Sequence, residues 1–200
     1  MSIKNIVFDF GGVLIDWNPR YLYRNVFTDK SEMEFFLQNI CSSEWNLKQD
    51  AGYSLSEATK ERQMLYPDYK REIEMFYKDW PEMLGGEILE NTRLRRPLKA
   101  KYRLFGLSNW SAETFPIAFK RYPFFEELEG IVLSGQEKMI KPDKEIYNVL
   151  LKRYGLQAGE SLFIDDNLTN VVTAKEMGFS TIHLKDGVHL EEELIKMGIL

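Results

Sequence analysis

Four short motifs carry side chains that can bind a divalent metal ion and a phosphate group. Asp9 follows an apolar run in "FDFGGVL", the pair Ser108 and Asn109 ends "RLFGLSN", and Lys141 lies in "MIKPD". A fourth motif, "SLFIDD", ends in two adjacent aspartates. Clustered carboxylates attract hard cations such as Mg²⁺, whereas hydroxyl, amide and ammonium groups donate hydrogen bonds to phosphate oxygens. Together these residue types predict a site for a metal ion and a phosphate.

The predicted strands explain how motifs so far apart in the sequence reach one place. Five apolar runs are typical of buried parallel strands, and ligands of such sheets bind at the carboxyl ends of the strands. Each motif alone is weak. Asp165 and Asp166 give the strongest signal, because adjacent carboxylates at a buried strand end repel each other and need a cation. The predicted strands are residues 3–10, 103–109, 130–134, 161–166 and 180–184.

Helical patterns separate the later strands. Residues 143–154 and 168–177 carry apolar side chains at helical spacing, and a glycine follows each segment. This alternation predicts an α/β fold: a Rossmann-like, five-stranded parallel sheet with helices on both faces, in three layers. Between the first two strands only helical patterns occur, with Ser31 and Ser54 as expected N-caps. We therefore expect an α/β core of residues 1–18 and 86–200, with residues 19–85 inserted as a helical domain.

Composition and charge restrict the classes of partner. The chain has 200 residues, which suits one ordinary domain or one domain with a modest insert, and 44% of them are hydrophobic, enough to fill a core. Its formal net charge of −5 gives no electrostatic reason to expect nucleic acid or an anionic membrane as a partner. No apolar run approaches the length of a membrane span, and the first strand starts too early for a signal peptide. We expect a cytoplasmic monomer or homodimer whose single cysteine, Cys41, packs in the interior.

The sequence resembles the haloacid dehalogenase superfamily of phosphohydrolases over essentially the whole chain. The resemblance rests on "FDFGGVL", "LSN", "IKPDKEIY" and "FIDDNLTN", and the helical insert looks like the α-helical cap domain of that family. The stretch "LSGQEKMIKPDKEIYNVLL" followed by "FIDDNLTNVVTAKEMGF" looks closest to sugar-phosphate phosphatases of the α-D-glucose-1-phosphate phosphatase type. It is also similar to the N-terminal phosphatase domain of soluble epoxide hydrolase.

The resemblance implies a role for each motif residue. Asp9 would attack phosphorus and form an aspartyl-phosphate. Mg²⁺ would be held by the carboxylates of Asp9 and Asp166 and by the main-chain carbonyl of Gly11. Lys141 would neutralise charge on the phosphoryl group and on Asp9. The remaining implied roles are phosphate binding by Ser108, Asn109 and Gly12, and support of the ligands by Asp165 and Asn170.

One position departs from the pattern of the family. Most of its phosphatases carry a second aspartate two residues after the nucleophile, as the general acid and base for the leaving alcohol, and here that position is Gly11. A positioned acid–base group contributes about 10²–10⁴-fold in rate. The preferred interpretation is a Mg²⁺-dependent phosphatase acting on a small phosphorylated metabolite such as glucose 1-phosphate, whose anomeric oxygen needs less protonation. Asp16 is a candidate for a substitute acid, although its position favours a cap of the following helix.

Two other interpretations stay open. Enzymes of the 2-haloacid dehalogenase branch also lack the second aspartate. Displacement of halide from carbon needs no metal, however, and so would not require the pair Asp165 and Asp166. A phosphometabolite-binding module that has lost catalysis would keep the same phosphate site without turnover.

The helical insert is expected to close over the site and select the substrate. Its sequence alone does not identify that substrate, and every candidate has an alternative role in packing or helix capping. The candidates for substrate contact are Trp45, Asn46, Asp50, Tyr53 and Trp80.

Overall fold

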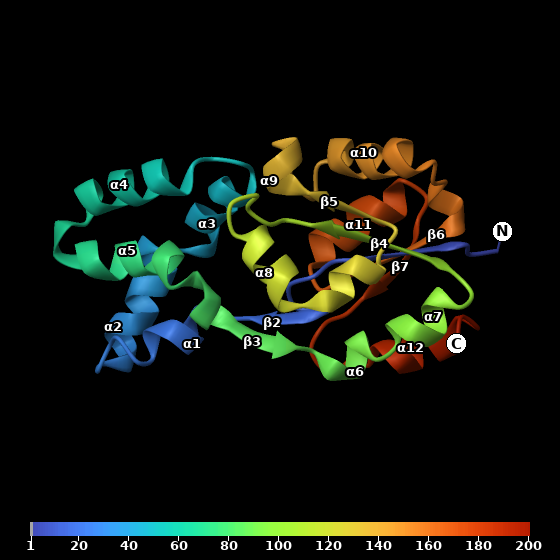
Figure 1. Ribbon diagram of the computed structural model, residues 1–200, viewed down its shortest axis with the longest axis horizontal. Helices are drawn as coiled ribbons and strands as arrows, with labels where there is room; N and C mark the ends of the chain where they lie inside the picture. Colours follow the sequence, from blue (N-terminus) through green and yellow to red (C-terminus); the bar gives the residue numbers. More distant parts are fainter. Residues whose placement is uncertain (1) are drawn as a thin grey trace.

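The strand β1 (Asn5–Phe8) lies at the centre of a parallel sheet in the computed structural model, which describes residues 2–200 (Figure 1). All pairs in this sheet are parallel, and the strand order is β5-β4-β1-β6-β7. This order confirms the predicted five-stranded Rossmann-like sheet. The other strands are β4 (Arg103–Ser108), β5 (Gly130–Leu133), β6 (Ser161–Asp165) and β7 (Ser180–His183).

The strand order determines where a ligand can bind. Strands β4 and β5 follow β1 on one side of the sheet, and β6 and β7 lie on its other side. The order therefore reverses at β1, and ligands of open α/β sheets bind at the carboxyl ends of the strands beside such a reversal. The register places Phe8, the last residue of β1, level with Gly106 and Ile164 on the neighbouring strands. The three strands consequently deliver their following residues to one edge.

Helices cover both faces of the sheet, because alternate side chains of each strand point in opposite directions. Val7 packs with the helices α10 (Lys144–Tyr154) and α11 (Leu168–Glu176). Ile6 and Phe8 belong to the larger core cluster on the opposite face. The helices that contribute to that cluster include α7 (Arg95–Lys99), α8 (Phe115–Arg121) and α12 (Leu190–Lys196), while the short helices α6 (Leu89–Thr92) and α9 (Ser134–Glu137) join neighbouring elements.

A helical segment extends from one end of the molecule along its longest axis (Figure 1). Its interior is largely aromatic, with Tyr23 packed against Phe36 and Trp45 packed edge-on against Phe76. None of its described helices, nor any other described helix, is long and apolar enough to cross a membrane. The segment contains α1 (Arg20–Tyr23), α2 (Lys30–Phe35) with the π-helical turn η1 (Phe36–Ile40), α3 (Ser43–Asp50), α4 (Leu55–Leu65), α5 (Lys70–Lys78), and the short 3₁₀ turns η2 (Pro67–Tyr69) and η3 (Trp80–Met83).

The two expected N-caps in this segment have different outcomes. Ser54 caps α4, because its hydroxyl accepts a hydrogen bond from the backbone N–H of Glu57. The prediction for Ser31 is wrong: the N-cap of α2 is Asp29, whose carboxylate accepts from the N–H of Ser31. Both residue types cap helices well, and here the aspartate two residues earlier takes the position.

Both connections to the helical segment run through a small antiparallel ribbon that the sequence did not predict. Strand β2 (Ile15–Trp17) pairs with β3 (Leu84–Glu87), and Trp17 lies opposite Leu84. The strands are short, and β3 contains two glycines, so neither shows the apolar run on which strand prediction depends. The chain therefore leaves and re-enters the α/β part at one place. The domain boundaries at residues 18/19 and 85/86 stay a prediction.

Candidate active site

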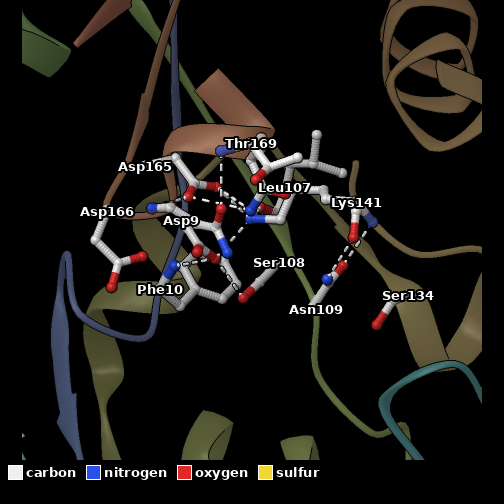
Figure 2. Close-up of polar contacts among 12 residues, drawn as sticks. Asp9, Phe10, Leu107, Ser108, Asn109, Ser134, Lys141, Asp165, Asp166 and Thr169 are labelled. Carbon is white, nitrogen blue, oxygen red and sulfur yellow. Dashed lines mark hydrogen bonds and ion pairs between the residues drawn. The ribbon is translucent and has the colours of Figure 1, made fainter. Parts of the chain in front are cut away.

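Asp9 follows β1 directly and is fixed by three donors. Its backbone N–H donates to the carbonyl of Ile164, which continues the pairing with β6. One carboxylate oxygen, Oδ1, accepts from the N–H of Phe10 at 2.7 Å and from the hydroxyl of Ser108 at 2.6 Å, and lies 3.0 Å from Nζ of Lys141. Figure 2 shows these contacts converging on Asp9. Since no described residue donates to Oδ2, that oxygen is available to a ligand.

Lys141 lies behind Asp9 and is 2% exposed. Its ammonium group donates to the carbonyl of Leu107 at 2.9 Å and to the carboxylate of Asp165 at 2.6 Å. Burial opposes protonation of the lysine, but the charges of Asp165 and Asp9 outweigh it and hold the pKa of Lys141 above its ordinary value. The lysine therefore stays protonated at neutral pH, with its ammonium group next to the carboxylates of Asp9 and Asp165.

Asn109 holds the loop that carries this lysine. Its side-chain amide donates to the carbonyl of Lys141 at 2.9 Å, and its side-chain oxygen accepts from the N–H of Lys141 at 2.8 Å. The two hydrogen bonds join the end of β4 to the loop before α10. The Asn109 side chain thus positions Lys141, a role that the sequence motif did not indicate.

Asp165 and Asp166 have different environments although they are adjacent. Asp165 is fully buried and accepts hydrogen bonds from the N–H of Asn167 and the side chain of Asn170. Asp166 is exposed at the rim. One carboxylate oxygen from each of Asp9, Asp165 and Asp166 can be chosen so that all three lie within 4.8 Å of one another. The structure thus brings the three predicted acids together, and Asn170 donates to Asp165.

The electrostatics of this cluster suit a divalent cation. Burial raises the pKa of Asp9 to about 6, and repulsion by Asp165 adds to this despite the opposing charge of Lys141. Burial, followed by the charge of Asp9, also raises the pKa of Asp166 to about 6. A bound cation would relieve this repulsion, and the donors are all hard oxygen atoms. The residues present therefore fit Mg²⁺.

The two glycines after Asp9 have distinct surroundings. Gly12 has φ of +71°, and a Cβ atom added there would lie 2.2 Å from Oδ2 of Asp166. Gly12 is therefore required for Asp166 to lie beside the turn, and its N–H donates to the carbonyl of Ile15 rather than facing a phosphate. Gly11, by contrast, borders open space, with no atom within 4 Å of an added Cβ. This space is where a side chain at residue 11 would project.

A cavity of about 140 Å³ opens in front of Asp9 and Gly11. The α/β part and the helical segment both line it. Of the residues expected to contact substrate, Asn46, Asp50 and Trp80 line the cavity. Trp45 packs against Phe76, and Tyr53 donates to Glu61, so these two do not line it. The remaining lining residues are Trp17, Tyr77, Ser108, Asn109, Trp110, Ser111 and Thr114.

Asp50 ends helix α3 and joins it to the α/β part. Its Oδ1 accepts from the backbone N–H of Ser111 at 3.0 Å, and its carbonyl accepts from the hydroxyl of Ser134. Its Oδ2 accepts from the side-chain amide of Asn46 at 2.8 Å. Burial raises the pKa of Asp50 to about 7, against the lowering effect of the Ser111 N–H. The sequence indicated the residue but not this environment.

Asp16 has neither of the roles considered for it. It lies in β2, accepts a hydrogen bond from the hydroxyl of Tyr21 at 2.6 Å, and packs against Gly85. It does not line the cavity. Nor does it cap the following helix, since the N–H of Arg20 donates to Asn18 instead. Asp16 is therefore not a substitute for the missing acid at residue 11.

Comparisons with known proteins identify a family and several relatives of the chain. A model of the haloacid dehalogenase-like hydrolase family matches residues 6–184. The sesquiterpene phosphatase AstK of Aspergillus oryzae is 28% identical, covering 94% of this chain and 92% of that protein. The D-ribitol-5-phosphate phosphatase of Bacteroides thetaiotaomicron is 23% identical, covering 96% and 97%.

Among solved structures, an enzyme of the same family from Bacteroides thetaiotaomicron, in complex with magnesium and inorganic phosphate, superposes with a TM-score of 0.76. It is 26% identical and covers 96% of this chain and 99% of its own. L-2-haloacid dehalogenase from Xanthobacter autotrophicus shares the fold at 17% identity, with a TM-score of 0.67, covering 100% of this chain and 85% of its own.

Proposed function

The chain belongs to the haloacid dehalogenase-like hydrolase family, and on that premise we propose that it is a Mg²⁺-dependent phosphatase of small phosphorylated metabolites, acting through an aspartyl-phosphate on Asp9. The observation that carries the proposal is the cluster of three carboxylates, one of them directly after the central strand. The similar proteins from Aspergillus oryzae and Bacteroides thetaiotaomicron support it, because both are phosphatases.

The metal would be held by the carboxylates of Asp9 and Asp166 together with the main-chain carbonyl of Gly11. When bound, Mg²⁺ neutralises charge on the phosphoryl group and orients it for in-line attack. The exposed position of Asp166 at the rim leaves room for the waters that this ion normally keeps. This assignment gives Asp9 and Asp166, whose negative charges repel each other, a common function as metal ligands.

The residues around Asp9 prepare it for nucleophilic attack. The three donors to Oδ1 hold the carboxylate in one orientation, which reduces the entropy lost in reaching the transition state. The Asp9 carboxylate attacks phosphorus, and the bond from phosphorus to the leaving oxygen breaks. Lys141 compensates for negative charge beneath the site throughout, because its own ammonium group is buried and paired. Water then cleaves the aspartyl-phosphate.

The cavity favours a small leaving group with hydroxyl groups. Its volume of about 140 Å³ is bounded by the polar side chains of Asn46, Asp50 and Ser111 and by indole rings. Polar groups at fixed positions select hydroxylated ligands, and aromatic faces pack against the carbon skeleton of a sugar or polyol. Sugar and polyol phosphates are accordingly the substrate class that we propose, with glucose 1-phosphate among the compounds to assay.

The cluster of acids also favours phosphatase chemistry over dehalogenation. Halide displacement from carbon needs no metal, so it gives no reason to hold three carboxylates within 4.8 Å of one another. Phosphoryl transfer to a carboxylate involves two anions and does require a cation. The shared fold with the haloacid dehalogenase therefore does not change the proposal.

The test is a panel of phosphorylated metabolites assayed for phosphate release after metal removal and with added Mg²⁺. We expect Mg²⁺-dependent release from at least one sugar or polyol phosphate, and none with Asp9→Asn. A phosphoenzyme that is labile to hydroxylamine would identify the acyl phosphate. Halide release from a 2-haloacid without metal, or phosphate binding without any turnover, would overturn the proposal.

A further inference from the structure

We propose that Asp50, on helix α3 of the helical segment, is the general acid and base for the leaving group, facing the place where residue 11 offers no carboxyl group. The inference rests on the proposed phosphatase function. It assigns to the helical segment a part of the chemistry as well as contact with the substrate.

The first argument is position. Gly11 borders open space in the same cavity that Asp9 lines, so a leaving group attached to phosphorus at Asp9 extends into that space. Asp50 lines this cavity from the helical segment. Asp9 and Asp50 are the two carboxyl groups among the lining residues. Once Asp9 has become the nucleophile, Asp50 is the carboxyl group left to exchange a proton with the leaving oxygen.

The second argument is orientation. The N–H of Ser111 fixes Oδ1 of Asp50, and the side-chain amide of Asn46 fixes Oδ2. Asn46 is itself in contact with the hydroxyl of Tyr77, whose one proton is shared between the side-chain oxygens of Asn46 at 3.0 Å and Gln49 at 2.9 Å. A protonated carboxyl group can keep both acceptor contacts, since the hydroxyl oxygen retains lone pairs while its proton is free to donate. The group is thus held in place and still has a proton to give.

The third argument is charge. No ion pair is found for Asp50 among the described residues, so no cation locks it in the ionised form. The titratable groups that interact with it are Asp9, whose charge acts across the cavity, and Tyr77 of helix α5. Burial and the charge of Asp9 both raise the pKa of Asp50, which reaches about 7. A group with that pKa can both give and accept a proton near neutral pH, as the two halves of the reaction require.

Asp50 alone accounts for both proton transfers of the reaction. In the first step the Asp9–phosphorus bond forms, the bond from phosphorus to the leaving oxygen breaks, and the Asp50 proton passes to that oxygen to give the alcohol. In the second step water attacks phosphorus and gives its proton to the Asp50 carboxylate. The Asp9–phosphorus bond then breaks, which releases inorganic phosphate and restores both carboxyl groups.

The test compares Asp50→Asn with Asp16→Asn, the same change at a carboxyl group outside the cavity. One substrate is the sugar or polyol phosphate that the wild type hydrolyses fastest, whose leaving oxygen needs a proton. The other is 2,4-dinitrophenyl phosphate, whose leaving phenolate does not. We expect Asp50→Asn to lower kcat for the first substrate by about 10²–10⁴-fold, while Asp16→Asn stays within about twofold of the wild type.

The aryl phosphate distinguishes proton transfer from a structural role. With Asp50→Asn we expect its first turnover to keep its rate within about threefold, followed by slow turnover, because the second step still needs a base. This gives a burst of dinitrophenolate close to one equivalent per enzyme. An equal loss in the first turnover of both substrates would overturn the inference, as would full activity on the sugar phosphate.

A wild-type measurement makes the test independent of how well the variant folds. If Asp50 is the acid, kcat/KM for the sugar phosphate falls above pH about 7, whereas the first turnover of the aryl phosphate has no such decline. The same decline for both substrates would overturn the inference and leave the phosphatase function intact. A wild type that hydrolyses neither substrate would overturn the proposed function, and the inference with it.

Discussion

Lys141 and Asp165 form an ion pair of 2.6 Å in which both side chains are completely buried. Such a pair is costly to break, because removing one partner leaves an uncompensated charge in the interior. We expect Lys141→Met to lower the free energy of unfolding by about 3–5 kcal/mol at pH 8, measured by urea denaturation. Lys144→Met removes an exposed pair with Glu176 and should cost less than about 1 kcal/mol. Equal losses in the two variants would contradict this view of the buried pair.

Gly12→Ala should weaken metal binding. The new Cβ would meet Oδ2 of Asp166 at 2.2 Å and displace a proposed ligand of Mg²⁺. We expect the Mg²⁺ affinity to fall by about 10–100-fold, the size of loss seen when groups that orient metal ligands are changed. Isothermal titration of the metal-free protein would measure it.

Gly155→Ala is the matched control for this change. Gly155 has φ of +64°, close to that of Gly12, but an added Cβ there meets nothing within 4 Å. Both variants carry the strain of alanine in the left-handed region, about 1–2 kcal/mol. Only the Gly12 variant should lose Mg²⁺ affinity. A comparable loss for Gly155→Ala would mean that backbone strain, rather than contact with Asp166, is the cause.

Asp50 should make the stability of the metal-free protein depend on pH. Its pKa is raised from 3.8 to about 7 in the folded chain, so the folded state binds this proton more tightly than the unfolded state does. The resulting stabilisation is fully present below pH 3.8 and is lost as the pH rises through about 7. The unfolding free energy of the wild type minus that of Asp50→Asn should therefore decrease as the pH rises across this window, by at most about 1.4 kcal/mol per pH unit. A difference that increases with pH would contradict the raised pKa.

Metal binding should restore stability above pH 6. Burial raises the pKa of Asp9 to about 6, so folding the metal-free chain at higher pH keeps an ionised carboxylate in an unfavourable place. Asp166 is exposed at the rim, where solvent weakens the same effect. We expect Mg²⁺ to raise the melting temperature more at pH 8 than at pH 5, because protons compete with the metal at low pH. The variant Asp9→Asn should lose most of this pH dependence.

Asn109→Ala should impair catalysis through the loop that carries Lys141. The two hydrogen bonds between Asn109 and the Lys141 backbone would be lost, so the ammonium group would no longer be held as closely below Asp9. We expect kcat to fall by about 10–100-fold with a smaller change in KM, measured by steady-state kinetics. Asn25→Ala removes an exposed amide that does not line the cavity and serves as the control.

The α/β part of the site was predictable from the sequence because local patterns determine it. Asp9, Ser108 and Asp165 each end an apolar run, and runs of that kind form parallel strands whose carboxyl ends share one edge. The side-chain function of Asn109 could not be derived in this way, because it depends on a loop 32 residues later in the chain.

The helical part of the site was less accessible to sequence reasoning. Asn46, Asp50 and Trp80 were candidates, but only packing against the α/β part decides that they line the cavity while Trp45 does not. The contact of Asp50 with Ser111 joins residues 61 positions apart, and no periodicity signals it. The weak proposal for Asp16 came from nearness in sequence alone, and the pairing of β2 with β3 directs that side chain to Tyr21.

The paired strands β2 and β3 also bear on how substrate enters. Since Trp17 lies opposite Leu84, the two chain connections to the helical segment lie side by side and can act as one hinge. Turning about this hinge would part Asp50 from Ser111 while the hydrogen bonds of the five-stranded sheet remain whole. We expect Asp50 to move away from Asp9 in the same movement that lets product out, so that an open molecule keeps its nucleophile but lacks its proton donor.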